Sequence, residues 1–200
     1  MRPAVFLDRD GVINRLVPSG PQSLLVAPRA ASDFILLPCV CLAVNLLRRS
    51  GLLVVVVTNQ PEISRGRLSE DELERMHLPL RTTIPVNAVY TCPHNDKDGC
   101  YCRKPLPGLL LRAAREWQIS LKDSFLIGDS WRDIEAGRAA GCRTILLTPT
   151  RRVRGLPKAD YLFPHLLAAA VAIGSGLRRH SVHSTDREAT YQRSFRMARG

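Results

Sequence analysis

The sequence predicts an α/β protein built on a doubly wound, Rossmann-like parallel sheet with helices on both faces. Short apolar runs rich in β-branched residues alternate with segments of helical period, a pattern typical of strand–helix–strand units with right-handed crossovers. One run, Leu52–Val57, is apolar throughout, as in parallel strands that are covered on both faces. Polar residues directly follow several of these runs, at the strand ends where such sheets bind ligands.

Five strands are expected at the apolar runs. They are Ala4–Leu7, Leu52–Val57, Val86–Tyr90, Phe125–Ile127 and Thr144–Leu147. Four helices are expected between them, where apolar residues recur at helical spacing. They are Val40–Arg49, Ser69–Arg81, Leu109–Trp117 and Trp131–Ala140. A closing helix is expected in the last apolar stretch, Leu162–Ile173.

Local signals mark several helix ends. Gly51 and Gly141 stand just after two of the expected helices, where glycine readily takes the left-handed conformation that ends a helix. Ser69 followed by Glu72 has the spacing of a capping box, which satisfies the first free amides of a helix. Pro107 suits the start of the next helix, since its fixed φ is already helical.

Length and composition are those of one globular domain. The chain has 200 residues, of which 45% are hydrophobic and 24% charged. We expect residues 1–175 to form the domain and residues 176–200 a basic, disordered tail. The net charge of +11 is unevenly spread: residues 1–150 hold 19 basic and 15 acidic side chains, and residues 151–200 hold 10 and 3. The tail lacks regularly interleaved aromatic residues, so nucleic acid is not an expected partner.

The sequence indicates a reduced, cytoplasmic protein. The N-terminus lacks the long apolar segment of a secretory signal, and the longest apolar stretches are too short to span a bilayer. Six cysteines are present, but nothing in the sequence points to an oxidising compartment. We expect a monomer that does not bind membranes.

A tight cluster of cysteine and histidine predicts a structural zinc site. Cys92, His94, Cys100 and Cys102 lie within eleven residues. Three thiolates and one imidazole complete a tetrahedral zinc site and leave no position for a catalytic water. The alternative is a chance cluster of free thiols. A zinc ion here would brace the loop that carries the next two residues, Arg103 and Lys104.

A second constellation follows the expected strands and is typical of phosphoryl transfer. Its members are Asp8 and Asp10 after the first strand, Thr58-Asn59-Gln60 after the second, Lys104, and Asp129 after the fourth. Transfer through a carboxylate needs a nucleophilic acid, a neighbouring acid that moves protons, donors for the phosphoryl oxygens, and a hard divalent cation held by oxygen ligands. A lone Asp-x-Asp-Gly is more typical of an ordinary turn with solvated charges.

Taken together and in order, these motifs resemble those of the haloacid dehalogenase (HAD) superfamily of aspartyl-phosphate phosphatases. The resemblance implies that Asp8 is the nucleophile and Asp10 the general acid and base. It implies that Thr58 and Lys104 stabilise the phosphoryl group. It further implies a Mg²⁺ ion held by Asp8, by the backbone carbonyl of Asp10 and by Asp129.

Two residues are less clearly placed. Asp133 is either an outer partner of Mg²⁺ or the salt-bridge partner of Arg132 or Arg138. His77 lies on a helix rich in charged residues, where we expect it to be solvated.

The zinc-loop pattern and the Cys-Arg-Lys-Pro run resemble one subgroup, the histidinol-phosphate and D-glycero-D-manno-heptose 1,7-bisphosphate phosphatases. The resemblance implies hydrolysis of a sugar bisphosphate, the heptose compound at C7. The small loops of the sequence leave no room for a large cap domain. It also implies substrate contacts from Asn59, Gln60 and Arg103, the last suited to a second phosphate through its two-pronged guanidinium. The alternatives are histidinol phosphate as substrate, a 3′-phosphate at a nucleic-acid end, and, from another class, a non-catalytic, zinc-stabilised module that binds nucleic acid.

Overall fold

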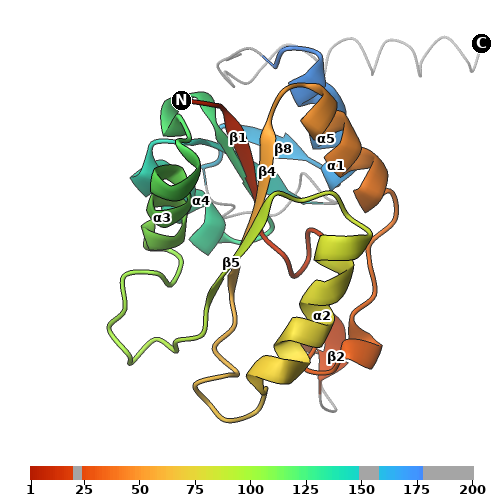
Figure 1. Ribbon diagram of the computed structural model, residues 1–200, viewed down its shortest axis with the longest axis vertical. Coiled ribbons are helices and arrows are strands. Elements are labelled where there is room, and N and C mark those ends of the chain that lie inside the picture. The colour runs from red at the N-terminus through yellow and green to blue at the C-terminus, as the bar shows by residue number, and fades with distance from the viewer. Residues whose placement is uncertain (20–23, 149–157, 178–200) are drawn as a thin grey trace, which may run out of the picture.

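The computed structural model describes residues 1–19, 24–148 and 158–177 and contains a six-stranded parallel sheet (Figure 1). Its strands are β1 (Ala4–Leu7), β4 (Leu53–Asn59), β5 (Ala88–Cys92), β6 (Phe125–Gly128), β7 (Arg143–Leu147) and β8 (Tyr161–Phe163). The order across the sheet is β5-β4-β1-β6-β7-β8, and every neighbouring pair is parallel. The predicted parallel sheet is therefore confirmed, with β1 in its interior.

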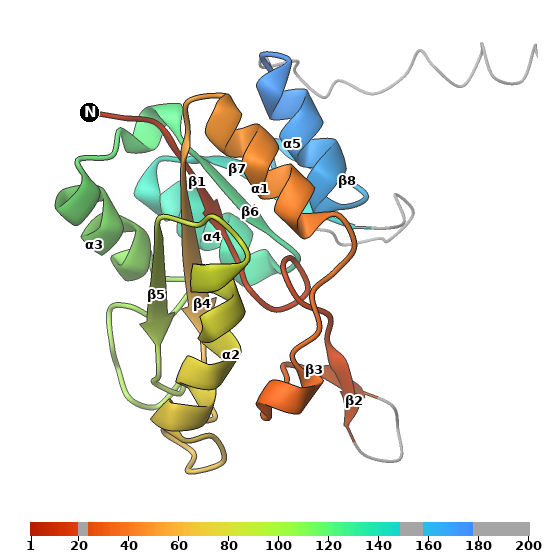
Figure 2. The same ribbon diagram turned by 45° about the vertical axis from the view of Figure 1, so that its right-hand side comes forward.

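The described residues also contain five α-helices, four of which cover the sheet. They are α1 (Val40–Arg49), α2 (Glu70–Thr82), α3 (Gly108–Trp117), α4 (Trp131–Ala140) and α5 (Leu166–Gly174). Helices α1 and α5 lie together on one face, and α3 and α4 lie on the other (Figure 2). Helices on both faces make the sheet doubly wound, as the sequence predicts.

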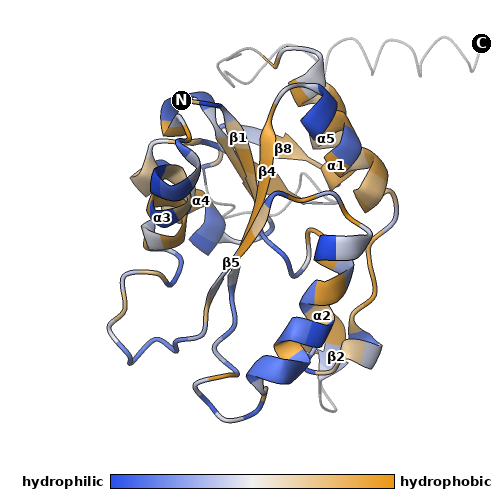
Figure 3. Ribbon diagram, viewed as in Figure 1, coloured by the Kyte–Doolittle hydropathy of each residue, from blue (hydrophilic) through white to orange (hydrophobic). Residues whose placement is uncertain are grey.

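The strand side chains divide between two hydrophobic clusters, one on each face of the sheet. In β1, Val5 and Leu7 pack in the cluster that includes α1 and α5, whereas Ala4 and Phe6 pack in the cluster that includes α3 and α4. All four are fully buried, and burying one large apolar side chain contributes about 1.5–3 kcal/mol. The hydrophobic colouring of the central strands in Figure 3 reflects this double coverage. Burial on both faces fixes β1, and with it the residues that follow its carboxyl end.

The last apolar stretch contains a strand as well as a helix, so the helix expected over Leu162–Ile173 is wrong at its start. Residues Tyr161–Phe163 pair with β7 as strand β8, and α5 begins only at Leu166. Pro164 separates the two elements, and the His165 ring nitrogen Nδ1 accepts a hydrogen bond from the amide of Ala168 (3.2 Å), which caps the helix. A short apolar run does not by itself distinguish a buried strand from a buried helix.

The segment between β1 and α1 forms a small hairpin that the sequence did not predict. Strands β2 (Val17–Ser19) and β3 (Leu24–Val26) pair antiparallel, and each has only three residues. A 3₁₀ turn, Ala31–Asp33, follows them. No larger cap domain is present in residues 1–19, 24–148 and 158–177.

The expected basic tail lies largely outside the described residues, which end at Leu177. Within the described ranges, no helix is long and apolar enough to cross a membrane.

Candidate functional site

The predicted site residues meet at the carboxyl edge of the sheet. Asp8 follows β1, Thr58 and Asn59 are the last residues of β4, and Asp129 follows β6. Since β1 pairs with both β4 and β6, these three strand ends are neighbours. Lys104 reaches the same place from the loop before α3 and is 2% exposed.

Lys104 lies at the centre of a buried network of charges. Its Nζ atom is 2.8 Å from Asp8 Oδ1 and 2.5 Å from Asp133 Oδ1, and it donates to the Val57 carbonyl at 2.9 Å. Burial alone would favour the neutral amine, but the carboxylates of Asp133 and Asp8 raise the pKa of Lys104 above its ordinary value. Lys104 is therefore a cation at neutral pH.

The partner of Asp133 differs from the salt bridges considered above. Asp133 is fully buried and pairs with Lys104, not with Arg132 or Arg138. Arg138 instead pairs with Glu135 on the same helix. The second oxygen of Asp133 accepts hydrogen bonds from the amide (3.2 Å) and hydroxyl (2.5 Å) of Ser130, because Asp133 stands one turn into α4 and points back to its first residues.

Three carboxylates converge closely enough to share a cation. Oxygens of Asp8, Asp129 and Asp133 all lie within 4.8 Å of one another. Burial, followed by the charge of Asp133, raises the pKa of Asp8 to about 8 and that of Asp129 to about 6. Carboxylates whose ionised forms are disfavoured in this way are stabilised by a nearby cation, and carboxylate oxygens are the ligands that Mg²⁺ prefers. The donor set therefore fits a hard divalent cation.

Two glycines allow this close approach. Gly11 has a φ of +83°, and a Cβ atom there would overlap the carboxylate of Asp129. A Cβ atom on Gly128 would likewise overlap the side chain of Asp133. Any other residue at these positions would displace the converging carboxylates, which gives the Asp-x-Asp-Gly motif its physical reason.

Asp10 is not part of this group of three carboxylates and is surrounded by nitrogen donors. Its Oδ1 accepts from Asn14 Nδ2 at 2.9 Å, and its Oδ2 accepts from Gln60 Nε2 at 2.8 Å. The Arg9 guanidinium contacts both oxygens. The same Gln60 nitrogen lies 2.9 Å from the Thr58 hydroxyl, so Gln60 links the ends of β1 and β4.

Asn59 is bound to the backbone of Lys104. Its Oδ1 accepts from the Lys104 amide and its Nδ2 donates to the Lys104 carbonyl, both at 3.0 Å. This two-point contact holds the loop of Lys104 against the end of β4. The amide of Asn59 is thereby occupied by the chain itself.

The four predicted zinc ligands lie together beside this edge. Cys92 ends β5, and the loop after it brings His94, Cys100 and Cys102 back to it. The Cys92 sulfur is 3.0 Å from that of Cys102 and 3.6 Å from that of Cys100, and His94 Nδ1 is 3.3 Å from the Cys102 sulfur. Ligands at the corners of a tetrahedral zinc site are about 3.5–4 Å apart. The distance between the Cys92 and Cys100 sulfurs falls in this range, whereas Cys102 lies closer to Cys92 and to His94. The chemistry of the set, three thiols and one imidazole, fits zinc.

Arg103 follows this cluster and lies on the rim of the site. Its Nε donates to Asp96 at 2.8 Å, and its Nη1 donates to the His94 carbonyl at 3.2 Å. The Arg103 side chain is 12% exposed. Hydrogen bonding by Arg103 lowers the pKa of Asp96, which keeps this pair ionised.

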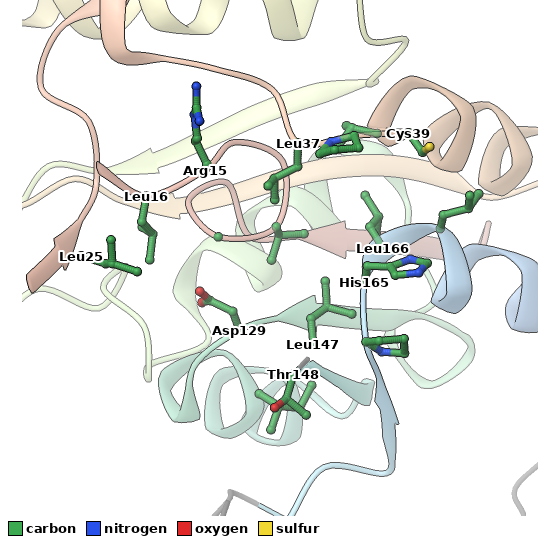
Figure 4. Close-up of a pocket in the computed structure, with 17 residues that line it drawn as sticks. Arg15, Leu16, Leu25, Leu37, Cys39, Asp129, Leu147, Thr148, His165 and Leu166 are labelled. Carbon is green, nitrogen blue, oxygen red and sulfur yellow. The ribbon is translucent and has the colours of Figure 1, made fainter. Parts of the chain in front are cut away.

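A pocket of about 780 Å³ opens beside Asp129. Asp129, Leu16 and Leu25 lie at one end of it, and His165 and Leu166 lie at the other (Figure 4). The lining is mostly apolar and comes from the loop after β1, Leu25 of β3, the start of α1, the end of β7 and the start of α5. The described part of the pocket thus contrasts with the charged rim around Arg103.

Two buried residues at the site were missed or misplaced by sequence reasoning. Arg9, between the two aspartates, is fully buried, and His77, expected to be solvated, is 1% exposed. A signal for His77 exists in the sequence. The buried residues of α2 are Leu73, Met76, His77 and Leu80, which is the i, i+3, i+4, i+7 spacing of one helix face.

Comparison with known proteins gives consistent matches. Residues 101–169 match the HAD-hydrolase-like family model. The chain is 35% identical to the D-glycero-beta-D-manno-heptose-1,7-bisphosphate 7-phosphatase of Pseudomonas aeruginosa, over 86% of this chain and 98% of that protein. It is 37% identical to the enzyme of the same name from Vibrio cholerae, over 74% and 82% of the two chains.

Solved structures agree with this. The D,D-heptose 1,7-bisphosphate phosphatase of B. bronchiseptica, complexed with magnesium and phosphate, has a TM-score of 0.72 and 32% identity, covering 86% of this chain and 97% of that one. A putative HAD-like phosphatase from Mesorhizobium loti has a TM-score of 0.70 and 27% identity, covering 90% and 89%.

Proposed function

Because this chain belongs to the HAD family of phosphatases, we propose that it hydrolyses D-glycero-D-manno-heptose 1,7-bisphosphate at C7. The observation that carries the proposal is the meeting of Asp8, Lys104 and Asp129 at one sheet edge, in a chain whose curated relatives are named for this substrate. Arg103 on the rim supports a substrate with a second anionic group, since its guanidinium suits a phosphate.

We assign the nucleophile to Asp8. Its Oδ1 is held by the Lys104 ammonium and by the amide of Arg9, each at 2.8 Å, so Oδ2 is the oxygen that attacks phosphorus. The bond from phosphorus to the sugar oxygen breaks as the aspartyl-phosphate forms on Asp8. Lys104 and the Thr58 hydroxyl stabilise the charge that develops on the phosphoryl oxygens.

Asp10 moves the proton in both steps. In the first step it gives a proton to the departing sugar oxygen. In the second step the ionised Asp10 takes a proton from water, which attacks the phosphorus and releases phosphate from Asp8. The two steps return both carboxyl groups to their starting states.

A Mg²⁺ ion held by Asp8, Asp129 and the backbone carbonyl of Asp10, with Asp133 beside them, would neutralise charge between the nucleophile and the phosphate. We propose that zinc binds Cys92, His94, Cys100 and Cys102 and fixes the loop that carries Arg103 and Lys104. The contacts of Asn59 with Lys104 favour a positioning role for Asn59 in place of direct substrate contact. Gln60 is likewise assigned to holding Asp10.

Cys39, Cys41 and Cys142 are unpaired thiols, and the other three cysteines are assigned here to zinc; we propose a reducing, cytoplasmic location on this basis. We further propose that the chain acts as a monomer.

The test is phosphate release with Mg²⁺ from three compounds: the heptose 1,7-bisphosphate, histidinol phosphate and a 3′-phosphorylated oligonucleotide. We expect release from the heptose compound, with one phosphate per molecule and the C1 phosphate retained. Asp8→Asn should reduce release to background, because an amide cannot replace the carboxylate nucleophile. Asp71→Asn, an equivalent change at an exposed position of α2, is the control and should retain full activity.

Preference for histidinol phosphate would contradict the substrate, and full turnover by Asp8→Asn would contradict the nucleophile. Binding of the oligonucleotide without phosphate release from any compound would favour the nucleic-acid module over the enzyme.

A further inference from the structure

Arg9 is a fully buried cation between the two aspartates of the site. Its guanidinium grips the Asp10 carboxylate through three contacts: Nε to Oδ1 at 3.1 Å, Nη2 to Oδ1 at 2.9 Å, and Nη2 to Oδ2 at 3.0 Å. A buried arginine paired so closely with one carboxylate restricts the orientation of that carboxylate. The proposed reaction uses the backbone amide of Arg9 but not its guanidinium.

The outer end of Arg9 is fixed by two other elements. Its Nη1 lies 3.2 Å from Nε2 of His77 in α2, and its guanidinium carbon lies 5.5 Å from the centre of the Phe34 ring. Because a guanidinium can only donate, His77 Nε2 must be the acceptor. Arg9 is thus held at one end by α2 and holds Asp10 at the other.

His77 is suited to accept this hydrogen bond. Burial, with the positive charge of Arg9 adding to it, lowers the pKa of His77 to about 4, so the ring is neutral at pH 7. Its proton is then on Nδ1, which lies 3.8 Å from Glu74 Oε1. The neutral His77 ring therefore holds the Arg9 guanidinium by a hydrogen bond without placing a second positive charge beside it.

Building on the proposed function, we propose that Arg9 and His77 are positioning residues that aim the Asp10 carboxyl group at the leaving oxygen of the substrate. Proton transfer needs the acid within hydrogen-bond reach of that oxygen, and a displacement of about 1 Å can reduce the rate by about 10²-fold. Asn14 and Gln60 contact Asp10 too, but the arginine contact alone engages both of its oxygens and is fixed from a separate helix.

The role can be tested through the leaving group. The alcohol leaving from the heptose 1,7-bisphosphate needs a proton as it departs, whereas p-nitrophenolate is stable without one. The ratio kcat/KM reports the steps up to the first irreversible one, here transfer to Asp8. If Asp10 is displaced from the leaving oxygen, kcat/KM therefore falls for the heptose compound, whereas kcat/KM for p-nitrophenyl phosphate stays unchanged.

We expect His77→Leu and Arg9→Lys to lower kcat/KM for the heptose 1,7-bisphosphate by about 10–100-fold. For p-nitrophenyl phosphate, kcat/KM should stay within about twofold of the wild-type value by the same reasoning. The value of kcat should fall for both esters, because Asp10 also serves the shared second step. His77→Gln, whose side-chain oxygen can accept from Arg9, should restore most of the loss.

The matched control is Leu78→Gln, at the next residue of α2 but with a side chain that faces solvent (57% exposed). It should match the wild type on both esters. Thermal unfolding of every variant identifies any that fails to fold. If His77→Leu fails to fold, Arg9→Lys alone provides the test of the positioning role.

Equal losses of kcat/KM on both esters, or no loss in His77→Leu and Arg9→Lys, would overturn the positioning role while leaving the proposed function intact. Inactivity of the wild-type chain on both esters would overturn the proposed function itself and the positioning role with it.

Discussion

Individual side chains at this site have protonation properties set by burial, and His77 offers the clearest measurable case. In the unfolded chain a histidine has a pKa of about 6.5, whereas burial lowers the pKa of His77 in the folded protein to about 4. As the pH falls below about 6.5, the unfolded chain gains a proton that the folded one does not. The contribution of His77 to the free energy of unfolding therefore falls with acidification.

We predict that wild type loses about 2 kcal/mol of stability between pH 7.5 and 5.0 relative to His77→Gln. The comparison removes the effect of other groups, such as Asp8 and Asp129, whose raised pKa values act in the opposite direction in both proteins. Urea unfolding at a series of pH values measures the difference. If the free energy of unfolding changed with pH in the same way in both proteins, His77 would not have a lowered pKa in the folded state. The control Leu78→Gln should show the pH dependence of the wild type.

At the scale of elements, the loop between β5 and α3 links a thiol cluster to Lys104, the lysine proposed to stabilise the phosphoryl group. Cys102 precedes Arg103 and Lys104 directly, and Lys104 is further tied to β4 through Asn59. A zinc ion would therefore stabilise the loop and hold the side chains of Arg103 and Lys104 at the site.

Removing zinc with a zinc-selective chelator, in excess Mg²⁺, should lower the unfolding midpoint and kcat/KM together. Loss of about 2 kcal/mol corresponds to about 4–8 °C for a chain of this size. Cys100→Ser should behave like the chelated protein and bind less than one zinc per chain by metal analysis. Cys41→Ser, outside the cluster, should keep its zinc and its activity; a chelated protein with unchanged midpoint and kinetics would disprove the zinc assignment.

The elements also explain what could be predicted from the sequence. The strand positions follow from apolar runs, and the site follows from the polar residues after them, because both signals are local. The division between β8 and α5 was missed because an apolar run suits either element. The contacts of Arg9 with His77 and of Lys104 with Asp133 join residues 68 and 29 positions apart, and only the packed helices and loops bring these side chains together.

At the scale of the whole molecule, the sheet and the proposed site lie within residues 1–177. A chain that ends after Leu177 should therefore keep kcat/KM for the heptose compound within about twofold and keep its unfolding midpoint. Removing residues 178–200 takes away six arginines and two acidic residues, so electrostatic attraction of the substrate should change modestly and most visibly at low salt. A large loss of activity at ordinary salt would show that the tail has a direct role.

The position of the cysteine-containing loop at the sheet edge has a consequence for how such enzymes diversify. The loop leaves from β5, which is an edge strand, whereas Asp8 follows β1 in the sheet interior. An insertion, deletion or exchange between His94 and Cys100 would leave the pairing of the inner strands and the four proposed zinc ligands untouched, and loops tolerate such changes best. Selection or design could therefore change which phosphorylated compound is recognised by replacing one peripheral segment, while the reaction itself is inherited unchanged.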